Sequence, residues 1–198
     1  MKLYFAPRTR AVRPRWLLEE LEVPYELVKL DLSKQENRTP AHLALHPFGE
    51  VPVLIDGEVT LFESSAICLY LADRFPEKRL APPLGSPHRG PYLQWLLFAE
   101  VALDPVVLEF YRNAQLPEAE KADLSKQQAR IGDVLAVIDG RLGDREFVVG
   151  GSFTAADVVM ASILHWANTM KLLDVRPRLF DYMMRHARRP ATRRAVSG

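Results

Sequence analysis

The segment VPVLIDGEVTLFESSAI, residues 51–67, decides how the fold of this chain is predicted. Two short runs of mostly β-branched and apolar residues flank the dipeptide Asp56-Gly57, which is the strongest local signal for a two-residue hairpin turn. An apolar-periodic stretch follows Ser64 and indicates a helix. The sequence therefore predicts a β-hairpin that leads directly into a helix.

The junction between this hairpin and the predicted helix is suited to a small zwitterion. A serine at a helix start lies beside free backbone N–H donors and the positive end of the helix dipole, so Ser64 indicates a socket for a carboxylate. Glu63 precedes it and supplies a negative charge that pairs with an ammonium group. The two groups together fit the free end of an amino acid.

The run VPVL, followed by a hairpin and then by ESSAI, resembles the glutathione-binding segment of the glutathione S-transferase family. The resemblance implies that Pro52 follows a cis peptide bond and that the backbone of Val51 pairs with the cysteinyl unit of glutathione. It also implies that Glu63 and Ser64 hold the γ-glutamyl group. Arg38 lies in the loop where related enzymes bind the glycyl carboxylate; the alternative is a solvated loop charge.

The residues before the hairpin predict a strand at 2–5, a helix, and a second strand at 25–30. Such a βαβ start implies parallel pairing through a right-handed crossover. With a short helical turn at 42–45, the order becomes β-α-β-α-β-β-α, which the resemblance identifies as a thioredoxin-like domain. We expect this α/β domain to cover residues 1–77, with a Pro/Gly-rich linker at 78–87.

Residues 88–198 predict a second, all-helical domain that forms a bundle. Pro105 interrupts a long apolar segment and predicts a kink or split there. Residues 155–173 are apolar almost all round and indicate a buried central helix. Thr154 and Asp157 have the spacing of a capping box, in a run that also resembles the capping segment of the family's helical domain. The Arg-rich C-terminal tail is expected to be solvated.

Composition excludes several classes of protein. The chain has 198 residues and a formal net charge of +1, which gives no sign of a nucleic-acid partner. No apolar run reaches the roughly 18 residues of a membrane span, and the predicted strand at the N-terminus leads us to expect no signal peptide. Cys68, the one cysteine, excludes an internal disulfide and suits a reducing cytoplasm. His42 and His46 have helical spacing, but no third ligand stands nearby, so we expect no metal site.

Glutathione's thiol needs help to ionise, because a free cysteine has a pKa of about 8.5. The resemblance places the activating group just after the first strand, where the hydroxyl of Thr9 is able to donate to sulfur. The alternative is an N-cap that only satisfies backbone donors. Alignment with the bacterial class that uses cysteine places Arg10 at the sulfur-contacting position, so cysteine-dependent chemistry is not expected. Arg10, its backbone N–H and Arg13 are further candidates, whereas Tyr4 more often packs.

The resemblance implies a bacterial, cytoplasmic homodimer that transfers the glutathione thiolate to hydrophobic electrophiles, without a metal. Alternatives are a glutathione-dependent isomerase or peroxidase, or a non-catalytic glutathione-binding or regulatory protein of the same fold. Arg10, His46 and Glu50 differ from the residues common in the family at these positions, which keeps open the alternative of a non-catalytic protein. The second substrate is expected between the domains, although such apolar side chains are more often simply core. Candidates for its site are Phe98, Leu103, Val107, Phe110, Tyr111 and Trp166, with Tyr111 and Arg112 as polar contacts.

Overall fold

The computed structural model describes residues 1–197, which form two compact units. The first unit contains Met1–Ala81 together with the C-terminal residues from Arg189 onward, and the second contains Pro82–Arg188. The last residues of the chain, assigned to the helical domain from sequence, therefore cluster with the N-terminal unit. Within residues 1–197, no helix combines the length and the apolar character that crossing a membrane requires.

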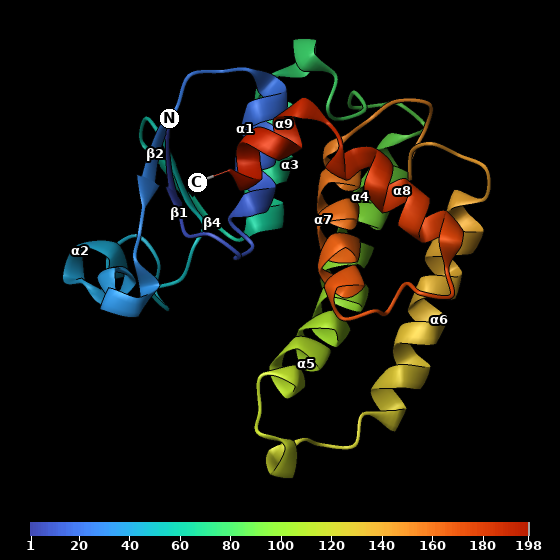
Figure 1. The fold of residues 1–198 in the computed structure, drawn as a ribbon. Coiled ribbons are helices and arrows are strands. Elements are labelled where there is room, and N and C mark those ends of the chain that lie inside the picture. The colour runs from blue at the N-terminus through green and yellow to red at the C-terminus, as the bar shows by residue number, and fades with distance from the viewer. Residues whose placement is uncertain (198) are drawn as a thin grey trace. The chain divides into compact units, whose positions relative to one another are not determined.

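The N-terminal unit is built on a mixed sheet (Figure 1). Its strands are β1 (Lys2–Phe5), β2 (Glu26–Lys29), β3 (Val53–Asp56) and β4 (Val59–Phe62), and its α-helices are α1 (Val12–Leu21), α2 (Pro40–Leu43), α3 (Ser64–Arg74) and α9 (Pro190–Val196). Short 3-10 helices lie at Leu32–Lys34, Glu36–Arg38 and Pro76–Lys78. The strand order is β2-β1-β3-β4, with β1 and β2 parallel and the other pairs antiparallel. The predicted order of elements through α3 is confirmed.

The β3–β4 hairpin is confirmed, with its turn one residue later than Asp56-Gly57 suggested. Asp56 pairs with Val59, so the two-residue turn consists of Gly57 and Glu58. Gly57 has φ +60°, a left-handed conformation that glycine adopts without a Cβ penalty. This glycine lets the chain reverse tightly and fixes the register of the two strands.

Alternation along β1 places helices on both faces of the sheet. Phe5 is 2% exposed and its ring lies 4.8 Å from the guanidinium carbon of Arg15 on α1. Tyr4 points to the opposite face, where its ring lies 5.5 Å from that of His42 on α2. Helices α1 and α3 pack side by side on one face, and α2 covers part of the other (Figure 1).

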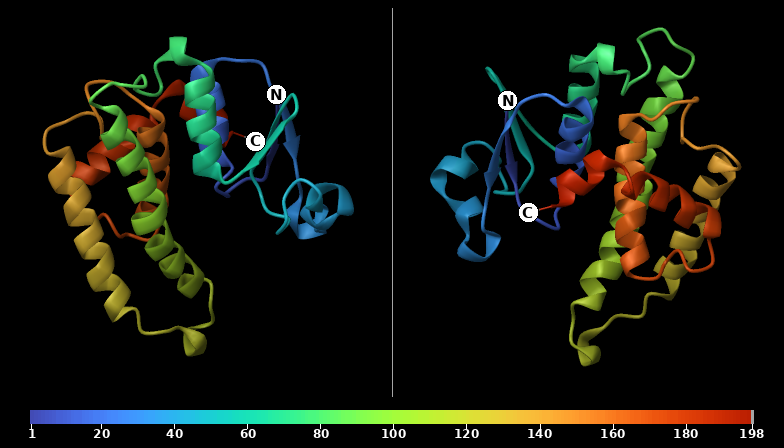
Figure 2. Two further views of the ribbon diagram at one scale, coloured as in Figure 1. Left: turned by 180° about the vertical axis from the view of Figure 1, so that it is seen from behind. Right: turned by 45° about the horizontal axis from the view of Figure 1, so that its top comes forward.

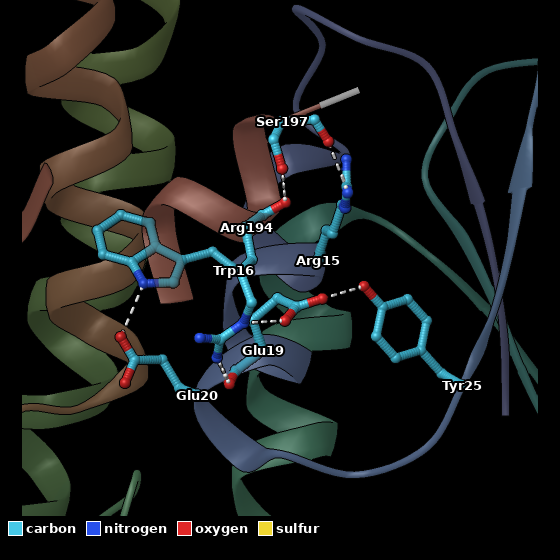
Figure 3. A network of polar contacts seen from close by, with 7 residues as sticks. All are labelled: Arg15, Trp16, Glu19, Glu20, Tyr25, Arg194 and Ser197. Carbon is cyan, nitrogen blue, oxygen red and sulfur yellow. Dashed lines mark hydrogen bonds and ion pairs between the residues drawn. The ribbon is translucent and has the colours of Figure 1, made fainter. Parts of the chain in front are cut away.

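The C-terminal helix α9 lies along α1 and is held there by ion pairs. The Arg189 guanidinium donates from Nε and Nη2 to both carboxylate oxygens of Glu20, at 2.6 and 2.7 Å. Arg194 Nε donates to Glu19 Oε2 at 2.6 Å (Figure 3). The expectation of a solvated tail is therefore wrong for these two arginines, because acidic side chains on α1 pair with them.

The second unit is a helical bundle (Figure 2). Its helices are α4 (Arg89–Phe98), α5 (Asp104–Ala114), α6 (Ser125–Leu142), α7 (Ala155–Thr169) and α8 (Pro177–Ala187), with a 3-10 helix at Glu118–Glu120. Helix α7 packs against α4, α5 and α8, and most of its residues are buried, which confirms the central helix. The Asp157 carboxylate accepts hydrogen bonds from the Thr154 and Val148 backbone N–H groups at 2.9 and 2.8 Å. The predicted capping box is thus confirmed.

Pro105 interrupts the helix as predicted, by way of a π-helical turn. This turn, Ala99–Leu103, joins α4 to α5, and within it the Asp104 N–H donates to the Ala99 carbonyl, five residues back. Proline lacks an N–H, and its ring would clash with the carbonyl four residues earlier in a regular α-helix. The extra residue per turn removes that conflict.

Replacement of Arg189 by alanine is expected to destabilise the N-terminal unit. The Glu20 side chain is 10% exposed, so loss of its bidentate partner leaves a largely buried carboxylate under-satisfied. We expect R189A to lower the unfolding free energy by about 1–3 kcal/mol in urea titrations followed by circular dichroism. K2A removes the exposed Lys2–Glu26 pair and is expected to cost at most about 1 kcal/mol. Equal effects of the two substitutions would contradict a structural role for the Arg189 pair.

Candidate functional site

The register of the sheet gathers three separate segments at one end. Val53 on β3 pairs with Tyr4 on β1 and with Phe62 on β4. Because β3 is antiparallel to both neighbours, the residues just before β3 lie beside those just after β1 and β4. These are Pro52, the loop that starts at residue 6, and Glu63.

The first segment is the backbone before β3, where the Val51–Pro52 peptide bond is cis, as the resemblance implied. Two side chains donate hydrogen bonds to the loop that leads to this peptide bond. His42, 3% exposed, donates from Nε2 to the Glu50 carbonyl oxygen at 2.8 Å. Arg38 Nη1 donates to the Phe48 carbonyl oxygen at 2.9 Å. Arg38 thus supports this loop, and its use on a ligand carboxylate stays a prediction.

A glycine completes the support of this loop. Gly49 has φ +57°, and a Cβ added there would come within 2.5 Å of the Asn37 carbonyl oxygen. The Asn37 side chain donates from Nδ2 to the Gly49 carbonyl oxygen at 2.6 Å. A larger residue at position 49 would push the 3-10 segment Glu36–Arg38 away from the loop.

The second segment is the start of α3, where the sequence predicted a carboxylate socket. Glu63 is exposed and has φ +72°, a conformation that is uncommon for residues other than glycine. Ser64 is 2% exposed and is the first residue of α3. Its Oγ accepts a hydrogen bond from Arg13 Nη1 at 3.2 Å. The helix N-terminus, a buried hydroxyl and a buried guanidinium therefore occupy one place, next to an exposed carboxylate.

The third segment is the loop between β1 and α1, which holds Thr9 and Arg10. The Thr9 hydroxyl donates to the Ala6 carbonyl at 2.7 Å, and its oxygen accepts from the Ala11 N–H at 3.2 Å. Helix α1 begins at Val12 and its N-cap is Ala11, so the alternative of Thr9 as the N-cap is wrong by two residues. The hydroxyl organises the turn that leads into α1, and its role at sulfur stays a prediction. Arg10 is half-buried in the same turn.

His46 supports the loop before β3 from a mostly apolar position. It is 4% exposed, its ring lies 4.8 Å from that of Phe62, and its Nδ1 accepts the Phe48 N–H at 3.1 Å. Burial lowers the pKa of His46, while the carboxylates of Glu50 and Glu63 oppose this shift and His42 adds to it. The loop therefore holds His46 neutral, with its proton on Nε2.

Sequence reasoning weighed His42 and His46 as possible metal ligands and His46 as a departure from the family pattern, and it missed their support of this loop. Both rings hydrogen-bond to backbone within eight residues of themselves. Within residues 1–197, no group of three His, Cys, Asp or Glu side chains gathers in a way that could hold a metal ion. The sequence did hold a signal for the role of His46. In an Asx-type turn, a side-chain acceptor binds the backbone N–H two residues later, and His46 Nδ1 accepts the Phe48 N–H in this way.

Candidates for the hydrophobic substrate lie in the second unit, and the structure brings some of them together. The rings of Tyr111 on α5 and Trp166 on α7 are 5.0 Å apart, and Tyr111 is 40% exposed. Phe110 is half-buried and Arg112 is exposed. Two further candidates are fully buried core residues and line no surface, Leu103 and Val107.

Comparison with known proteins agrees with this geometry. The family models for the glutathione S-transferase N-terminal and C-terminal domains match residues 1–73 and 118–185. Glutathione S-transferase GstA of Escherichia coli O157:H7 is 30% identical to this chain, over 100% of this chain and 98% of its own length. A solved sphingomonad glutathione S-transferase in complex with glutathione is 30% identical, with a TM-score of 0.85 over 99% of this chain and 97% of that one.

The chain belongs to the glutathione S-transferase family. A protein with another kind of name is also similar to this chain: the disulfide-bond oxidoreductase YfcG of Escherichia coli K12 is 29% identical over 98% of this chain and 93% of its own length. The mixed four-stranded sheet with a following helical unit is the glutathione S-transferase fold that the sequence predicted.

His46 makes the stability of the N-terminal unit depend on pH in a defined direction. Its pKa is lowered in the folded protein, so the unfolded chain takes up a proton first, below about pH 6.5. The stabilising contribution is complete above that pH and is lost as the pH falls through the lowered, folded-state value. We expect H46N, whose Oδ1 also accepts the Phe48 N–H, to make the unfolding free energy flatter between about pH 7 and 5.

Urea titrations at a series of pH values measure this effect. H165N, which removes an exposed histidine from α7, should retain the wild-type pH dependence. A wild-type slope in H46N would show that His46 does not titrate differently in the folded and unfolded states.

Proposed function

We propose that this protein is a glutathione transferase that joins the glutathione thiolate to hydrophobic electrophiles. The observation that carries the proposal is the convergence of the cis Val51–Pro52 backbone with Glu63 and the buried Ser64 at one end of the sheet. This arrangement offers a helix N-terminus and a hydroxyl to a carboxylate, a carboxylate to an ammonium, and a backbone segment to a peptide. Glutathione carries all three groups, and the sphingomonad relative has been solved with glutathione bound.

In the proposed complex, glutathione lies across the end of the sheet in an extended form. Its γ-glutamyl end binds Glu63 and Ser64, and its cysteinyl unit pairs with the Val51 backbone. Its glycyl carboxylate approaches Arg38, whose Nη1 already donates to the Phe48 carbonyl. The sulfur then faces the loop that contains Thr9 and Arg10. The Thr9 hydroxyl, which donates its one proton to the Ala6 carbonyl in this structure, would turn from that carbonyl to the sulfur when glutathione binds. There it and a guanidinium in that loop would both favour the thiolate over the thiol.

The apolar part of the electrophile is proposed to bind to the helical unit. The aromatic pair Tyr111 and Trp166 supports this assignment, since it offers a partly exposed ring surface. Phe110 and Arg112 are proposed to flank that pair. Binding both reactants in one place lowers the barrier to attack because their encounter no longer costs translational entropy at the reacting step.

The setting of this reaction is proposed from the family. We propose a cytoplasmic homodimer that acts in detoxification, with glutathione as co-substrate and without a metal ion. Exposed apolar side chains in both units support self-association; Phe48 and Val101 are each 71% exposed. Linkers of this composition favour two domains. The sequence placed them at residues 1–77 and 88–198, joined by 78–87, whereas the residues from Arg189 onward cluster with the first unit.

A second candidate function uses the same thiol for redox chemistry. The relative YfcG is named a disulfide-bond oxidoreductase and matches nearly the whole chain. In that case two glutathione molecules would reduce one disulfide or peroxide and leave as glutathione disulfide. Turnover of a disulfide or peroxide, without conjugation of any electrophile in a panel, would favour this second candidate.

The double variant E63A/S64A tests the socket. Loss of one charge-assisted contact to the ammonium and one to the carboxylate is expected to weaken glutathione binding about 100-fold or more in isothermal titration. E58A/T60A removes an acid and a hydroxyl from exposed positions on the same hairpin and should bind like the wild type. Unchanged affinity in E63A/S64A would refute the assignment of the socket.

Thr9 is tested by the ionisation of the bound thiol. Ultraviolet absorbance of the complex reports thiolate, and T9A is expected to raise the thiol's pKa by about one unit and to lower kcat/KM about tenfold. T9S keeps the hydroxyl, so its bound thiol should have nearly the wild-type pKa and the variant should retain most of the wild-type kcat/KM. An unchanged pKa in T9A would assign the stabilisation to Arg10 or to backbone donors. Absence of thiolate at neutral pH in the wild type would indicate a binding protein without catalysis.

A further inference from the structure

Three arginines of the helical unit gather around the C-terminal end of α6. Arg141 Nε donates to the Val148 carbonyl at 2.9 Å, and Arg145 Nη1 donates to the Arg141 carbonyl at 2.6 Å. Arg185 lies on α8, which packs against α6 (Figure 1), and its Nη1 donates to the Glu146 carbonyl at 3.4 Å. Each guanidinium is thus fixed by a backbone carbonyl at this end of α6.

These three arginines have no carboxylate partner within residues 1–197. Asp144 and Glu146 are exposed in the same loop, and neither forms an ion pair with them. The buried carboxylate of Asp157 accepts the Val148 N–H instead. A guanidinium carries five N–H donors, and each of the three donates one hydrogen bond inside the protein. Most of their donors are therefore available to a ligand.

Arg141 is held in position while its charge is not offset. It is half-buried, and its guanidinium carbon lies 5.6 Å from the centre of the Trp95 ring on α4. Burial lowers the pKa of Arg141, and the charge of Arg145 lowers it further. Arginine nevertheless keeps its proton at neutral pH, so two like charges are held near each other. An anion bound to both would relieve their repulsion and offset the partial loss of water around Arg141.

The number and kind of these donors favour phosphate over a carboxylate. A carboxylate has two oxygens and one charge, and one guanidinium satisfies it in a bidentate pair. A phosphate group has more oxygens and up to two charges, so it is able to bind two or three guanidiniums at once. The exposed Asp144 and Glu146 would repel the further charges of a polyanion, and the net charge of +1 gives no general attraction for one. A single phosphate group fits these constraints.

We propose that Arg141, Arg145 and Arg185 form a binding site for one phosphate group, carried either by inorganic phosphate or by a small phosphate monoester. Phosphate oxygens accept from the remaining donors of Arg141 and Arg145, and Arg185 adds a third positive charge from α8. The inference goes beyond the proposed function, because none of these residues is assigned to glutathione or to the electrophile.

The test titrates the protein with sodium phosphate, with glycerol 3-phosphate and with acetate, at fixed pH and ionic strength. Nuclear magnetic resonance locates the site, because the indole N–H signal of Trp95, identified with W95F, should shift saturably with phosphate. Isothermal titration measures the affinity, and acetate is expected to bind at least about tenfold more weakly than phosphate. R141M/R145M is expected to weaken phosphate binding about tenfold or more.

The matched control is K126M/R130M, which removes two exposed positive charges with the same spacing from the same helix and should keep the wild-type affinity. Where R141M/R145M does not fold, R145M/R185M is measured in its place. That variant leaves Arg141 on Trp95, and the same direction of change is expected.

Saturable binding of either phosphate compound that these variants weaken supports the inference, and the tighter ligand identifies the source of the phosphate group. Absence of saturable binding, equal affinity for acetate, or an equal loss in K126M/R130M overturns it. Each of these results leaves the proposed function standing, because the titrations contain no glutathione.

Discussion

The pairing of Val53 with Tyr4 on one side and with Phe62 on the other fixes the position of the candidate glutathione contacts in the N-terminal unit. Val53 is fully buried, so a shift of register by one residue would turn its side chain away from the core. The same shift would separate Pro52 from Glu63. Hydrophobic burial in the middle of the sheet therefore sets the geometry of polar groups at its end.

The loop that leads into β3 needs support because it has few regular backbone hydrogen bonds. His42 donates to the Glu50 carbonyl, Arg38 to the Phe48 carbonyl, and His46 accepts the Phe48 N–H. Each of these side chains gives a hydrogen-bond partner to a backbone group of the loop. The loop can consequently present the Val51 backbone in one conformation, which reduces the entropy lost when a peptide pairs with it.

Features encoded by neighbouring residues were predictable from sequence. The hairpin follows from Asp56-Gly57, and the interruption between α4 and α5 follows from the missing N–H of Pro105. Both depend on backbone restrictions within a few residues. The cis bond before Pro52 was inferred only through the family resemblance, since proline alone does not decide between cis and trans.

Features that join distant segments were not predictable. Helix α9 binds α1 through partners about 170 residues apart in the sequence, and nothing in the tail itself indicates which acids it meets. The Arg13–Ser64 bond spans 51 residues. The sequence identified Thr9 as a candidate hydroxyl but could not show its hydrogen bond. A hydroxyl that donates to the Ala6 carbonyl looks the same in sequence as one without that bond. These contacts depend on which side chains meet after folding, and a single sequence does not show that.

The charges of α1 run opposite to the order that favours an isolated helix, and this reversal has a physical consequence. Acidic residues normally stabilise the first turn and basic residues the last, but α1 has no acid in its first turn and no base in its last. Arg13 and Arg15 stand in its first half, and Glu19 and Glu20 in its second. The reversal costs helix stability, and α9 offsets part of that cost by pairing with both glutamates.

Arg10 and Arg13 stand near the start of α1, where the positive end of its dipole also lies. Glutathione bound as a thiolate has two negative groups near the starts of α1 and α3 in the proposed complex, the sulfur and the γ-glutamyl carboxylate. One cation placed between them would attract both and orient neither. Two separate helix starts would instead give each anion its own position in the proposed complex. In the proposed complex, a charge order that an isolated α1 would disfavour places basic residues and a helix dipole toward the anionic ligand.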